Sequence, residues 1–148
     1  MPPRAPVPVD ALQRALAAEH AAVWAYGLAG AFLVGKPAAQ LTEAAAAHQT
    51  RRDSAERLLT DAGAQPVQAE PGYLTPEPVT DSTSALRLVL TAETDAAAAW
   101  RSVIEVGPAE PVLRGTALDA LTAAAVQATH WRVVAGSEPA TVPFPGAP

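Results

Sequence analysis

Residues 63–81 read GAQPVQAEPGYLTPEPVTD, and this proline-rich stretch decides the fold. Its four prolines remove backbone hydrogen-bond donors and bias the residues before them away from the helical conformation. The stretch is too long for a hairpin turn but long enough to run the length of a helix bundle. We therefore expect residues 63–81 to run along the molecule without regular structure, so that the helices on either side of it are parallel.

Alanine-rich segments with a helical pattern lie on both sides of this connection, and no long stretch alternates with the period of a strand. Asp10 suits an N-cap, Pro37 suits the first turn of a helix, and Gly63 suits a helix stop. Short connections join the first segment to the second and the third to the fourth, which forces antiparallel neighbours. The sequence predicts an all-α fold, a four-helix bundle over about residues 10–35, 37–62, 82–106 and 110–134.

The composition limits the classes of protein to which the chain can belong. The absence of cysteine excludes disulfides, thiolate metal sites and cysteine nucleophiles. The net charge of −5 and the lack of a basic block give no support to nucleic-acid binding. No apolar run is long enough to span a membrane, and the N-terminus lacks the apolar core of a secretory signal. We expect a cytoplasmic protein with no nucleic-acid or membrane partner.

A length of 148 residues suits a single folded domain. We expect a flexible N-terminal segment over residues 1–9, the bundle over residues 10–135 and a proline-rich extended tail over residues 136–148. Phe144 either pins this tail to the body or leaves it loose.

Two segments, half the chain apart, resemble each other. Residues 16–26 read LAAEHAAVWAY and residues 90–100 read LTAETDAAAAW. Each places an aromatic residue seven positions after a glutamate, which puts both on one helix face: Tyr26 after Glu19, and Trp100 after Glu93. The second and fourth helices also correspond, since each carries a mid-helix histidine with an arginine soon after.

Glu19 and Glu93 are expected to point into the core, because the residues one and two turns away on the same faces are almost all apolar. A buried carboxylate needs a positive partner, or it binds a proton instead. One source of positive charge is a metal ion. The other is internal, from His48, His130, Arg51 and Arg52. Arg52 is the favoured donor, because it lies four residues after His48 and a guanidinium can clamp a carboxylate at two points.

These features resemble the ferritin-like superfamily, whose di-iron members use a Glu on helices 1 and 3 and a Glu-x-x-His on helices 2 and 4. The stretches AAEHAAVWAYG (17–27) and AHQTRRD (47–53), with the proline-rich tail, resemble a bacterial ferritin-like family of unknown function. The resemblance implies a ferritin-like bundle with the long connection between helices 2 and 3. It also implies a metal-ligand set of Glu19, His48, Glu93 and His130.

Two positions depart from the di-iron pattern. Helix 2 reads Ala45-x-x-His48 and helix 4 reads Gln127-x-x-His130, so both bridging glutamates are missing. The remaining set could hold one Fe, Mn or Zn ion but not easily a bridged pair. The residues expected around it, as second-shell or charge-compensating groups, are Arg52, Arg51, Gln127, Tyr26 and His20.

Three functions are compatible with these residues. The leading hypothesis is a non-catalytic protein with no cofactor, in which a buried Glu/His/Arg network replaces the metals and the role is to bind a ligand or partner or to self-associate through helix faces. The alternative is a metal-dependent oxidase or oxygenase with the reduced ligand set. Iron storage comes last, because the ferroxidase ligands are incomplete. We assign no catalytic residue.

Overall fold

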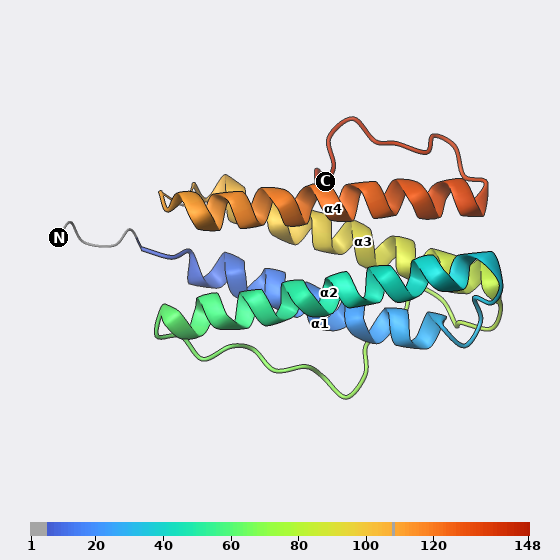
Figure 1. Ribbon diagram of the computed structural model, residues 1–148, viewed down its shortest axis with the longest axis horizontal. Helices are drawn as coiled ribbons and strands as arrows, with labels where there is room; N and C mark the ends of the chain where they lie inside the picture. The colour runs from blue at the N-terminus through green and yellow to red at the C-terminus, as the bar shows by residue number, and fades with distance from the viewer. Residues whose placement is uncertain (1–5, 108) are drawn as a thin grey trace.

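The computed structural model describes residues 6–107 and 109–148, and within them the chain is all-helical with no strand. The four helices are α1 (Val9–Ala29), α2 (Lys36–Asp61), α3 (Ser82–Glu105) and α4 (Pro111–Ala135). They lie side by side with their axes roughly aligned (Figure 1). The expected all-α class and number of helices are confirmed. The first five residues of the expected flexible segment over 1–9 lie outside the described residues.

Local sequence signals set most of the helix ends. Asp81 and Ser84 form a reciprocal capping box at the start of α3, and the Glu110 side chain accepts hydrogen bonds from two backbone amides at the start of α4. Gly63 takes a φ of 78° just after α2, a conformation that costs glycine little. The first helix is shorter than expected, ending at Ala29 instead of near Gly35. Beyond Gly30, hydrogen bonds between residues three apart tighten the last turn.

The connection between α2 and α3 runs along α1 (Figure 1). The Gln13 side chain donates to the Gln65 carbonyl at 2.7 Å and accepts from the Val67 amide at 2.8 Å. Farther along, the Tyr73 ring lies 5.7 Å from the Trp24 ring, centroid to centroid. Because this segment returns the chain to the end where α2 began, α2 and α3 run in the same direction.

The tail after α4 folds back along that helix (Figure 1). The Arg132 side chain donates to the Ala140 carbonyl at 3.4 Å, and the Arg101 side chain donates to the Pro145 carbonyl at 3.5 Å. Phe144 is 73% exposed, so its ring does not anchor the segment. Among the described residues, no helix is both long and apolar enough to cross a membrane.

The apolar core is divided into two main clusters, one towards each end of the bundle. On α1, one cluster extends to Leu16 and the other begins at Ala22. On α3, the same division falls between Ala92 and Trp100. Between these clusters lie buried charged side chains, contributed by the middle turns of α1, α2 and α3.

Candidate functional site

A histidine from α2 joins the two buried glutamates at the centre of the bundle. His48 Nδ1 lies 2.6 Å from Glu19 Oε2, and His48 Nε2 lies 2.9 Å from Glu93 Oε1. All three residues are 0% exposed. When both carboxylates are ionised, each can only accept hydrogen bonds, so both ring nitrogens of His48 donate and the ring is an imidazolium between two carboxylates.

The pKa values of His48 and Glu19 follow from their contacts. Burial by itself would lower the pKa of His48, but the hydrogen bonds and negative charges of Glu19 and Glu93 raise it above its usual value. Burial would likewise raise the pKa of Glu19, but His48, the Arg51 charge and a hydrogen bond from Trp100 bring it below the usual value. Both shifts favour the charged forms.

Arg51 supplies the second positive charge. Its Nε donates to Glu19 Oε1 at 2.9 Å, and its side chain is 15% exposed. Arg51 Nη2 also lies 2.9 Å from His48 Nδ1. That approach brings two donors together and is not a hydrogen bond, but the Glu19 carboxylate touches both groups and offsets their repulsion. Two carboxylates, one imidazolium and one guanidinium give a network with no net charge.

Each of the two glutamates accepts a hydrogen bond from the aromatic residue of the other segment, not from that of its own. Trp100 Nε1, on α3, donates to Glu19 Oε1 on α1 at 2.7 Å. The Tyr26 hydroxyl, on α1, donates to Glu93 Oε1 on α3, and accepts from Trp131 Nε1 at 2.7 Å. Burial and the neighbouring Glu93 raise the pKa of Tyr26, so its hydroxyl stays protonated as a donor. The aromatic residue of each segment therefore hydrogen-bonds to the glutamate of the other segment.

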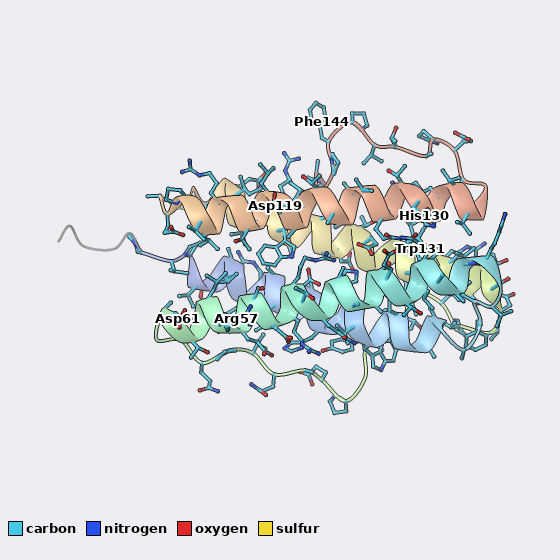
Figure 2. All side chains as sticks on the ribbon, in the orientation of Figure 1. Arg57, Asp61, Asp119, His130, Trp131 and Phe144 are labelled. Atoms are coloured by element: carbon cyan, nitrogen blue, oxygen red, sulfur yellow. The ribbon has the colours of Figure 1, made fainter. Side chains whose placement is uncertain are left out.

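Two of the residues expected at the site lie elsewhere. His130 is half-buried, with its ring 5.1 Å from that of Trp131, and it contacts neither glutamate. Trp131 takes the core position on α4 (Figure 2), because it continues the buried stripe of that helix whereas His130 is rotated about 100° from it. Arg52, the expected donor, instead pairs with Asp53 at 2.8 Å on the surface. Arg51 takes its place at Glu19.

The other expected neighbours support the bundle away from the network. Gln127 accepts a hydrogen bond from Gln40 at 2.8 Å, which links α4 to α2. His20 contacts the Val67 carbonyl at 3.0 Å and holds the connection that runs along α1. Trp100 and Trp131 are the network donors that sequence reasoning missed. Their position among apolar residues indicated core packing, and nothing in it indicated hydrogen bonds to the glutamates and to Tyr26.

The residues present do not fit a di-metal centre. The two glutamates contact opposite nitrogens of one imidazole ring, so they do not converge on a common point. Arg51 occupies Glu19 Oε1, and no bridging carboxylate comes from α2 or α4. Within residues 6–107 and 109–148, no group of three or more acidic, histidine or cysteine side chains has the arrangement of a metal site. Two buried side-chain atoms, Glu93 Oε2 and Gln127 Nε2, make no hydrogen bond with the described residues.

Comparisons with known proteins place the chain in an uncharacterised group. The model of a family described as "Domain of unknown function (DUF4439)" matches residues 11–148. The chain is similar to a solved structure described as that of a conserved hypothetical protein, rv2844, from Mycobacterium tuberculosis, with a TM-score of 0.81 and 36% sequence identity. The similarity covers 84% of this chain and 94% of that one. No protein among the curated ones matches.

Proposed function

The chain belongs to this domain family of unknown function (DUF4439), and from that premise we propose that it is a non-catalytic ferritin-like protein whose charge network replaces a di-metal centre. The long connection between α2 and α3 and the paired glutamates of α1 and α3 support the ferritin-like part of the proposal. The role that remains for such a bundle is to bind a ligand or to associate with a partner or a second copy.

The observation that carries this proposal is the position of His48 between the two glutamates. In the ferritin-like pattern this histidine is a metal ligand, which requires a free ring nitrogen. Here both nitrogens face carboxylate oxygens, at 2.6 and 2.9 Å. With Arg51 added, the protein neutralises both glutamates with its own side chains. A metal would have to displace those contacts.

We expect that Fe(II), Mn(II) or Zn(II), added to protein purified without chelators, leaves the melting temperature unchanged. A ligand that binds only the native state must raise the melting temperature, and an excess of about 100 Kd would add roughly 2.7 kcal/mol. The measurement is thermal unfolding monitored by circular dichroism, with metal analysis of the same sample. Glu93→Gln and His48→Ala serve as ligand-deficient controls.

A mononuclear metal site is the second candidate, favoured by the unpartnered Glu93 Oε2. It would make the protein a metal-dependent oxidase or oxygenase with a reduced ligand set. A metal-dependent rise in melting temperature that disappears in both control variants would establish this candidate and overturn the first.

Self-association through α4 is a further part of the proposal. Val126 and Val133 stand seven residues apart on one face of α4, Val112 stands fourteen residues before Val126, and each of the three is more than 60% exposed (68% for Val112, 65% for Val126 and 63% for Val133). The end of this stripe beyond Asp119, formed by Val126 and Val133, suits a helix–helix contact with a second copy. Sedimentation should show a dimer that the double substitution Val126→Glu/Val133→Glu converts to a monomer. If the native protein is monomeric at high concentration, the proposed self-association through α4 is wrong.

A further inference from the structure

A cleft opens between α2 and α4 and reaches two residues of the charge network. These two helices touch only sparsely, whereas α1 packs on both α2 and α3, and α3 packs on α4. The cleft has a volume of about 460 Å³, within the range of small-molecule sites. Its lining includes Arg51 and Trp100, the two side chains that contact Glu19 from this direction, together with Asp119 and the hydroxyls of Thr50, Ser54 and Thr116.

Arg51 offers the cleft a hydrogen-bond donor. Its Nε is bound to Glu19 and its Nη2 lies against His48, but Nη1 makes no hydrogen bond with the described residues. The contact with Glu19 fixes the guanidinium, so that little conformational entropy remains to be lost when a ligand binds. A guanidinium held in this way is suited to donate hydrogen bonds to a ligand carboxylate.

Asp119 offers the opposite charge. It is exposed on α4 (Figure 2) and lines the same cleft. Its carboxylate forms neither a hydrogen bond nor an ion pair with any side chain in the described part of the chain. The cleft therefore presents one cationic donor from α2 and one anionic acceptor from α4, with hydroxyl groups beside them.

We propose that this cleft binds a small zwitterion, a free amino acid or short peptide, with its carboxylate on Arg51 Nη1 and its ammonium on Asp119. A simple anion would meet the repulsion of Asp119, and a simple cation would leave Arg51 Nη1 without an acceptor. A zwitterion satisfies both groups and adds no net charge to a site whose buried part is already neutral. The inference rests on the proposed function, because it needs Arg51 held by Glu19 rather than displaced by a metal.

The test is calorimetric titration of the full chain with glycylglycine and with the proteinogenic amino acids at millimolar concentration. Acetate and methylammonium are the single-charge probes. We expect at least one zwitterion to bind and both single-charge probes to bind at least about tenfold more weakly. Asp119→Asn should weaken the zwitterion about tenfold or more. Asp61→Asn, an exposed carboxylate at the end of α2 and outside the cleft (Figure 2), should not change its affinity.

Three outcomes would overturn the inference: no zwitterion binds, acetate or methylammonium binds as tightly as the best zwitterion, or Asp119→Asn binds it unchanged. Because Asp119 is exposed and unpaired, its substitution should leave the fold intact, and circular dichroism of the variant checks this. If no zwitterion binds and metal ions leave the melting temperature unchanged, only the proposed ligand site is wrong. A metal-dependent rise in melting temperature removes the proposed function itself.

Discussion

Arg51 and Arg52 are adjacent in the sequence, but the carboxylates with which they pair differ in burial. Arg51 is the only arginine that contacts Glu19 among the described residues, and Glu19 is 0% exposed. Arg51→Ala should therefore leave a buried carboxylate partly unpaired and lower the free energy of unfolding by about 3 kcal/mol, the lower end of the range for breaking such a pair, because Arg51 is partly exposed. Urea unfolding measures the change.

Arg52→Ala is the matched control. The Arg52 side chain is 30% exposed and its partner Asp53 is 50% exposed, so the pair is screened by water and should be worth less than about 1 kcal/mol. Equal losses in the two variants would contradict the assignment of Arg51 to the network.

At the scale of the element, alanines set how closely the helices approach. Ala96 on α3 and Ala124 on α4 are both 0% exposed and pack in the same small cluster. Ala96→Leu should insert methyl groups where no space exists and destabilise the protein by roughly 1–3 kcal/mol. The change can be measured as a fall in the midpoint of chemical unfolding.

Ala98→Leu provides the comparison, because Ala98 lies on the exposed face of the same helix. Alanine and leucine have similar helix propensities, so this variant should stay within about 0.5 kcal/mol of the native protein. If Ala96→Leu proved equally harmless, α3 and α4 could not be as close as the structure has them.

At the scale of the whole molecule, the charge network should make the free energy of unfolding fall at both low and high pH. The raised pKa of His48 means that its contribution is complete below its ordinary value of 6.5 and is lost as the pH rises through the folded-state pKa. The lowered pKa of Glu19 means that its contribution is complete above its ordinary value of 4.5 and is lost as the pH falls through the folded-state pKa. The network should therefore stabilise the fold most between about pH 4.5 and 6.5.

The free energy of unfolding measured across pH tests this expectation, with His48→Gln as the informative variant. Removing the imidazolium should flatten the decline on the alkaline side, whereas His130→Gln, outside the network, should preserve it. An alkaline decline of the same size in His48→Gln would show that His48 does not carry the charge assigned to it.

The sequence by itself determined the helices and the burial of the two glutamates. Proline, glycine and capping residues are local signals, because they act on backbone groups within a few positions of themselves. Glu19 and Glu93 stand among apolar residues at helical spacing, and both are fully buried. Even the displacement of His130 could have been read from the sequence, since the apolar stripe of α4 passes through Trp131 instead.

Only the tertiary structure decided which side chains complete the network. Arg51 and Arg52 flank the buried stripe of α2 on opposite sides, about 100° apart around the helix, and helical spacing alone does not choose between them. The choice depends on which flank of α2 faces Glu19. The exchange of aromatic donors, with Tyr26 on Glu93 and Trp100 on Glu19, likewise depends on how α1 and α3 are placed side by side. Both are contacts between helices, and the periodicity of a single helix carries no information about them because it describes that helix alone.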